Sequence, residues 1–70
     1  FEGTGSCTYM FEVHQDTVPI EGMSIDPFGA ELREGKIWGR GSCDIKGGMA
    51  SMLHAFTRLV KEKPKGAASV

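Results

Sequence analysis

The sequence predicts an α/β fold with a mostly parallel sheet, and three observations support this prediction. The segment Cys7–Val13 is rich in residues that favour strands and carries a continuous apolar stretch over Tyr9–Phe11. Apolar residues from Met49 to Val60 then recur at helical spacing. Gly66–Val70 has the composition of a loop that enters another strand. A strand, a helix and a second strand make up one step of a parallel sheet.

The predicted first strand is covered on both faces, because an uninterrupted apolar run fits a strand inside a parallel sheet. Polar residues follow at once in His14–Pro19, the place where open α/β sheets bind their ligands. Ile20–Glu34 shows no sustained period, so we expect a long loop with little regular structure. Glu34-Gly35 signals a turn, and Lys36–Trp38 is a short strand at a sheet edge or in a small ribbon.

The helix is predicted from Lys46 onward, because apolar residues fall on one stripe of a 3.6-residue period. These residues are Met49, Met52, Leu53, Phe56, Leu59 and Val60. Asp44 is placed as the N-cap or just before it, and Lys61 suits the negative C-terminal end. Pro64 ends the helix, because it disfavours α geometry at Lys63.

The chain has 70 residues, 40% of them hydrophobic, which allows at most one small globular domain. A net charge of −1 without a basic block predicts neither nucleic-acid nor membrane binding, and no apolar run is long enough to span a membrane. A single strand–helix–strand step leaves both faces of its strands uncovered. We therefore expect a piece of a larger protein. Its expected location is cytoplasmic. The two cysteines, Cys7 and Cys43, are expected to be buried, reduced thiols.

Three residues have the chemistry of a metal centre. Zinc accepts imidazole nitrogen and carboxylate oxygen, the groups of His14 and Asp44. Asp16 lies two residues after His14, on the same side of an extended chain, so its carboxylate can orient the imidazole. Both oxygens of Asp44 can bind, which makes a bridge between two metals one interpretation and a helix cap the other. Gly39-Arg-Gly41 before a helix also fits an anion nest.

Each of two cationic side chains near these residues has two possible roles. Arg40 fits either a pair with a carboxylate or a surface charge, and Lys46 fits either a solvated side chain or a neighbour of the site.

Five motifs in this order resemble the dinuclear zinc aminoacylase and carboxypeptidase family, near its acetylornithine deacetylase and succinyl-diaminopimelate desuccinylase branch. The motifs are His14-Gln-Asp-Thr-Val-Pro19, Asp26-Pro-Phe28, Gly35-Lys36, Gly39-Arg-Gly41 and Asp44-x-Lys-Gly-Gly48. The resemblance implies that residues 1–70 form the N-terminal-side portion of a three-layer catalytic domain. The later catalytic segments and a smaller dimerisation domain would lie outside it.

The resemblance also implies the chemistry. His14 becomes a ligand of one zinc, Asp44 the carboxylate that bridges two, and Asp16 the catalytic-site residue that orients His14. Cobalt or manganese can replace zinc. The implied reaction is hydrolysis of the amide bond of an N-acyl amino acid or peptide by zinc-activated water, in a parent that is a homodimer. The general base and the other ligands fall outside the chain, so we expect these 70 residues alone to be inactive. The alternatives are a peptidase of the same family and a degenerate chain that binds no metal.

Overall fold

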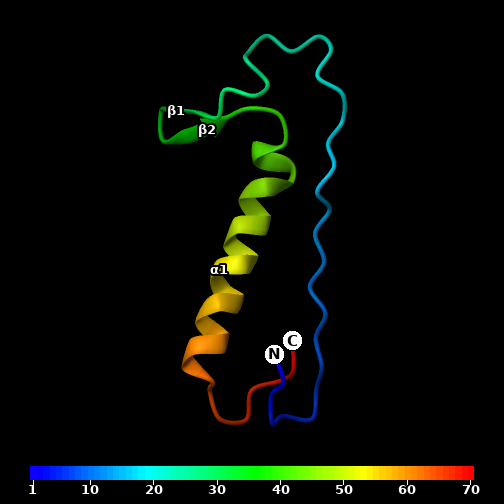
Figure 1. Ribbon diagram of the computed structural model, residues 1–70, viewed down its shortest axis with the longest axis vertical. Helices are drawn as coiled ribbons and strands as arrows, with labels where there is room; N and C mark the ends of the chain where they lie inside the picture. The colour runs from blue at the N-terminus through cyan, green and yellow to red at the C-terminus, as the bar shows by residue number, and fades with distance from the viewer. The chain divides into compact units, whose positions relative to one another are not determined.

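A computed structural model describes residues 1–70 as one helix, one small sheet and connecting segments (Figure 1). The elements in chain order are β1 (Glu31–Arg33), β2 (Lys36–Trp38), η1 (Ser42–Lys46) and α1 (Gly47–Glu62). The chain divides into two compact units, one formed by Phe1–Val13 with Met49–Val70 and the other by His14–Gly48. The chain is an α/β fragment, as the sequence predicts, but its one sheet is a two-stranded antiparallel one, so the mostly parallel sheet of a three-layer domain stays a prediction.

Helix α1 confirms the periodicity argument. It begins at Gly47, next to the predicted start, and ends at Glu62. Lys63 leaves the helix with a φ of 42°, a left-handed conformation that closes the last turn, and its N–H donates to the Leu59 carbonyl at 2.9 Å. The following proline, which lacks an N–H, prevents the helix from continuing.

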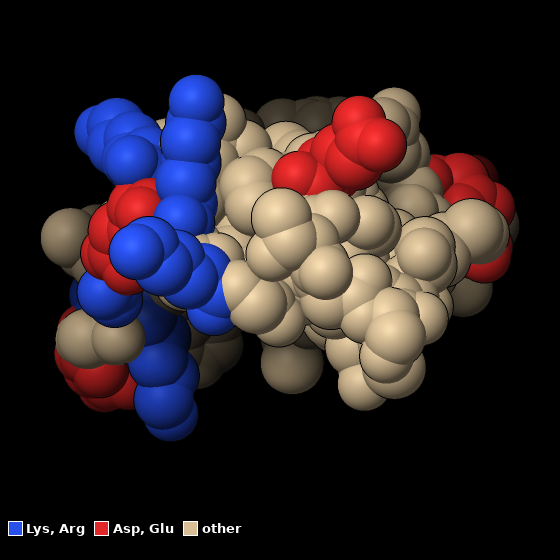
Figure 2. Space-filling model, turned by 90° about the horizontal axis from the view of Figure 1, so that it is seen from below, with Lys and Arg blue, Asp and Glu red and all other residues tan.

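The end of α1 is rich in cations. The sequence places Arg58, Lys61, Lys63 and Lys65 there, and Arg58 also donates to the Glu62 carboxylate one turn later at 2.9 Å. The space-filling view from below shows Lys and Arg side chains gathered on one side of that face (Figure 2). Positive charge near a helix C-terminus is favourable, because the last carbonyls carry partial negative charge.

The predicted strand over Cys7–Val13 does not form. The segment makes a single parallel bridge between Thr8 and Ser69. Its hydrogen bonds run from the Tyr9 N–H to the Ser69 carbonyl at 2.8 Å and from the Ser69 N–H to the Cys7 carbonyl at 3.0 Å. A strand exists only where a neighbour accepts and donates along its length, and here that neighbour is one residue. The parallel direction of the bridge agrees with the predicted strand–helix–strand step.

Strands β1 and β2 form an antiparallel hairpin in the second unit. Leu32 faces Ile37, and the connecting residues Glu34 and Gly35 both have positive φ, 55° and 69°. Two successive positive φ values are the mark of the tight turn that suits a two-residue hairpin. The predicted turn and the predicted ribbon strand at Lys36–Trp38 are confirmed. The prediction of an irregular loop up to Glu34 is wrong at β1.

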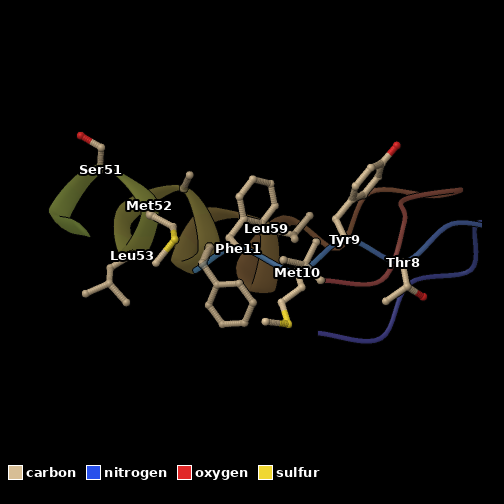
Figure 3. Close-up of a pocket in the computed structure, with 11 residues that line it drawn as sticks. Thr8, Tyr9, Met10, Phe11, Ser51, Met52, Leu53 and Leu59 are labelled. Carbon is tan, nitrogen blue, oxygen red and sulfur yellow. The ribbon is translucent and has the colours of Figure 1, made fainter. Parts of the chain in front are cut away.

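The apolar side chains of the first unit line an open groove and form no closed core. No hydrophobic residue of the chain is buried. Apolar residues of the N-terminal segment and of one face of α1, including Phe11, Met52 and Leu59, line a groove of about 950 Å³ (Figure 3). Cys7 and Cys43 are free thiols, as predicted, but both are exposed, because there is no core to enclose them. The apolar face of α1 thus lacks the cover that usually stabilises an amphipathic helix.

Candidate metal centre

The candidate site is a shallow hollow of about 300 Å³ in the second unit. Two loops supply its walls: the segment after Val13 and the turn between β2 and α1. The lining residues are His14, Asp16, Thr17, Val18 and Gly39–Asp44. Both loops were singled out from the sequence, and the structure brings their polar residues together.

His14 stands between the two aspartates. Its Nδ1–H donates to the backbone carbonyl of Asp16 at 3.0 Å, and the Asp16 carboxylate lies 3.3 Å from the same nitrogen. On the other side of the ring, Nε2 lies 3.1 Å from Oδ1 of Asp44. Asp16 thus contacts Nδ1 of the imidazole through its main-chain oxygen as well as its carboxylate, and its role in orienting the ring stays a prediction.

Both ring nitrogens of His14 face oxygen atoms, which has a chemical consequence. A neutral imidazole carries one N–H, so only one of these two contacts can be a hydrogen bond. The other requires a proton on the ring or a cation between Nε2 and Asp44. The Asp16 carbonyl, followed by the Asp44 carboxylate, accordingly raises the pKa of His14 above its usual value of 6.5.

The geometry fits a shared metal ion. Two ligands in a tetrahedral zinc site, each about 2.0–2.2 Å from the metal, lie roughly 3.3 Å from one another. The separation between His14 Nε2 and Asp44 Oδ1 is 3.1 Å, so both atoms can bind one ion after a small adjustment. No group of three or more His, Cys, Asp or Glu side chains is arranged so that it could hold a metal ion. His14 and Asp44 therefore supply part of a metal site and do not complete one. Their role as ligands stays a prediction.

Asp44 lies ahead of the helix and does not cap it. Its backbone is non-helical, with φ −117° and ψ 89°, its peptide bond to Ile45 is cis, and α1 begins only at Gly47. Asp44 lies within the wide turn Ser42–Lys46, called η1, which precedes α1. Of the two predicted positions, N-cap or just before it, the structure has the second. The Asp44 side chain points at His14, with Oδ1 3.1 Å from Nε2, and 84% of it is exposed.

Two residues of the hollow have roles that sequence reasoning left open. Lys46 donates from Nζ to the Gln15 carbonyl at 3.3 Å, so it is a neighbour of the site. Arg40 is neither paired with a carboxylate nor fully at the surface: it is half-buried, and its Nε is enclosed without a hydrogen-bond acceptor. Its main-chain N–H donates to the Pro27 carbonyl at 2.9 Å, which anchors the turn. A lysine that reaches back across a turn leaves no local pattern in the sequence.

Comparison with known proteins identifies the family. Residues 10–70 match the model of peptidase family M20/M25/M40. The chain belongs to this family, which confirms the resemblance of its motifs. No solved structure matches significantly.

The helix of the chain lacks the length and apolar character of a membrane span.

Several curated relatives share one name. The chain is 45% identical over 60 residues to succinyl-diaminopimelate desuccinylase 2 of Ruegeria sp. (strain TM1040), covering 81% of this chain and 15% of that protein. It is 35% identical over 71 residues to succinyl-diaminopimelate desuccinylase of Parvibaculum lavamentivorans, covering 97% and 18%. The same enzyme name applies to a relative from Acinetobacter baumannii that is 38% identical over 71 residues, covering 97% and 19%. The chain thus spans less than a fifth of the length of these relatives.

Proposed function

We propose that the protein carrying this chain is a metal-dependent hydrolase that cleaves the amide bond of N-acyl amino acids. The observation that carries the proposal is the approach of His14 Nε2 to Asp44 Oδ1 at 3.1 Å, with the other ring nitrogen held by Asp16. Membership of a peptidase family supports amide hydrolysis as the class of reaction. The relatives named succinyl-diaminopimelate desuccinylase support a deacylase of the desuccinylase type.

Three residues of the chain have different proposed roles at the site. His14 would contribute a nitrogen ligand, and Asp44 would contribute a carboxylate with two oxygens available to metal. Asp16 accepts a hydrogen bond donated by Nδ1 of His14, which would leave the lone pair of Nε2 free to bind a metal. Zinc, or cobalt or manganese in its place, supplies Lewis acidity and lowers the pKa of water when bound. The exposed hollow leaves room for an acyl group beside these ligands.

The fold supports a place for the chain within a larger domain. The parallel bridge between Thr8 and Ser69 is the contact expected where two neighbouring strands of a mostly parallel sheet begin to pair. The open apolar groove over α1 is the surface that further layers of a three-layer domain would cover. The remaining ligands, the general base and a dimerisation domain then lie outside residues 1–70. The isolated chain is consequently inactive.

The test compares the complete protein with and without metal on two kinds of substrate. We expect hydrolysis of N-succinyl or N-acetyl amino acids that is lost with a chelator and restored by zinc. The family description also makes a peptidase the second candidate, and release of amino acids from unacylated dipeptides would favour it. No turnover of either substrate by the metal-loaded protein would contradict the proposal and favour a degenerate chain. Turnover of N-acyl amino acids by the isolated 70 residues with zinc would contradict their expected inactivity.

A further inference from the structure

We propose that Lys46 is a positioning residue that holds the two halves of the candidate metal centre at the correct separation. Its side chain ties the loop carrying His14 and Asp16 to the turn carrying Asp44. The inference rests on the proposed function for its effect on metal binding. The tie itself exists in the metal-free protein and can be measured there.

The main contact is a hydrogen bond from Lys46 Nζ to the Gln15 carbonyl at 3.3 Å. This carbonyl belongs to the peptide bond that joins Gln15 to Asp16, and the next carbonyl, that of Asp16, accepts from the His14 ring. Lys46 itself follows Asp44 by two positions, and its own N–H donates to the Gly41 carbonyl at 2.9 Å. One residue is therefore fixed to the turn by its main chain and to the opposite loop by its side chain.

Gly41 makes room for this contact. It is the one buried residue of the chain and has a φ of 79°. A Cβ atom at this position would lie 3.0 Å from Lys46 Nζ and 2.7 Å from Cγ2 of Thr17. The turn is thus packed against both the ammonium group and the His14 loop. Only glycine suits a left-handed backbone that two side chains approach this closely.

The tie matters because the contact across the site is otherwise weakly restrained. The Asp16 and Asp44 side chains are 92% and 84% exposed, and half of His14 is exposed. Exposed side chains gain little from pairing alone, so they do not fix the distance between their loops. The Lys46 side-chain contact is also exposed and is long, at 3.3 Å, but it acts together with the main-chain hydrogen bond from the Lys46 N–H to the Gly41 carbonyl, which holds the other end of the residue. Lys46 therefore limits how far His14 Nε2 can move away from Asp44.

The experiment uses the complete protein, and its variants are Lys46→Met and Lys46→Arg. Methionine matches the lysine side chain up to its ε carbon and lacks only the donor group, whereas arginine keeps a charged donor. Lys65→Met is the matched control, because Lys65 is an exposed lysine in the loop after α1. The first measurement, without metal, is the carbonyl ¹³C chemical shift of Gln15 together with the amide ¹⁵N shift of Asp16. The second is the zinc affinity by calorimetry.

We expect Lys46→Met to move both chemical shifts and to weaken zinc binding roughly tenfold, the lower end of the effect seen for groups that orient metal ligands. Lys46→Arg should recover most of the affinity, and Lys65→Met should match the wild type. Unchanged Gln15 and Asp16 shifts in Lys46→Met would overturn the inference, even if zinc affinity fell, because Lys46 would then act only through its charge. Shifts that move while zinc affinity stays at the wild-type value would overturn it too. If the wild type bound no zinc, the proposed function would fail, and the shifts alone would still decide whether the tie exists.

Discussion

Replacing Gly41 by alanine tests how tightly the turn below the candidate site is packed. Two effects add at this position. A left-handed backbone costs a residue with a Cβ about 1–2 kcal/mol. Forcing extra atoms into a packed place typically costs about 1–3 kcal/mol more. The Cβ would lie 2.7 Å from Cγ2 of Thr17, whose branched side chain is stiff at χ1, and 3.0 Å from Lys46 Nζ, which can swing aside.

Gly22→Ala is the matched control. Its φ is +80° against +79° at Gly41, so the backbone strain and the loss of freedom in the unfolded chain are the same. No atom lies within 4 Å of the position that its Cβ would take. The difference between the two variants therefore isolates the contact with Thr17 and Lys46.

The free energy of unfolding of the complete protein, from urea denaturation, is the quantity to compare. Gly41→Ala should lower it by about 1–3 kcal/mol more than Gly22→Ala does. Equal losses for the two variants would refute the reasoning, because the Gly41 turn would then be as open as the Gly22 turn.

Two further predictions concern the imidazole. In the metal-free protein, NMR titration should give His14 a pKa above 6.5, and Asp44→Asn should lower that pKa only in part, because the Asp16 carbonyl is the larger cause. Since the pKa of His14 is raised in the folded state, these contacts contribute their full stability below the unfolded pKa of 6.5. That contribution is lost as the pH rises through the folded pKa. A His14 pKa at or below 6.5 would contradict this prediction. Asp16→Asn keeps the main-chain acceptor for Nδ1 of His14 but removes the carboxylate that lies 3.3 Å from this nitrogen. Zinc affinity or activity should therefore fall about 10-fold or more. Unchanged zinc affinity and activity would show that the Asp16 carboxylate does not orient the imidazole.

The sequence was most informative where structure depends on near neighbours. The helix follows from apolar residues at helical spacing, and its end follows from Pro64 acting on Lys63. The hairpin turn follows from Glu34-Gly35. These features depend on a few adjacent residues, so pattern and propensity suffice to predict them.

Strands were harder to predict, because pairing depends on distant residues. Cys7–Val13 has the composition of a strand, yet only Thr8 finds a paired neighbour, at Ser69. Glu31–Arg33 has one apolar residue and gave no strand signal, but it pairs with β2 across the turn. In both cases the available partner decided the outcome.

The side chains of the candidate site were predicted from the sequence, but its main-chain contacts were not. His14, Asp16 and Asp44 were singled out because of the chemistry of their side chains. The structure places both carboxylates beside the His14 imidazole. The acceptor role of the Asp16 carbonyl and the reach of Lys46 to the Gln15 carbonyl could not be predicted. Every residue has a carbonyl, and only the folded backbone decides which one a side chain meets.

The central claim is that Asp44 binds metal and bridges two ions. Zinc titration calorimetry on the complete protein tests it most directly, comparing the wild type with Asp44→Asn. Asp26→Asn is the control, because it removes the same charge while keeping the acceptor for the Phe28 N–H, which lies 2.9 Å from Oδ1 of Asp26. An amide has one neutral oxygen and cannot replace a bridging carboxylate. The account predicts two zinc ions per chain in the wild type and in Asp26→Asn, as in other two-metal sites, and loss of at least one in Asp44→Asn. Two zinc ions bound to Asp44→Asn with wild-type affinity would contradict the account.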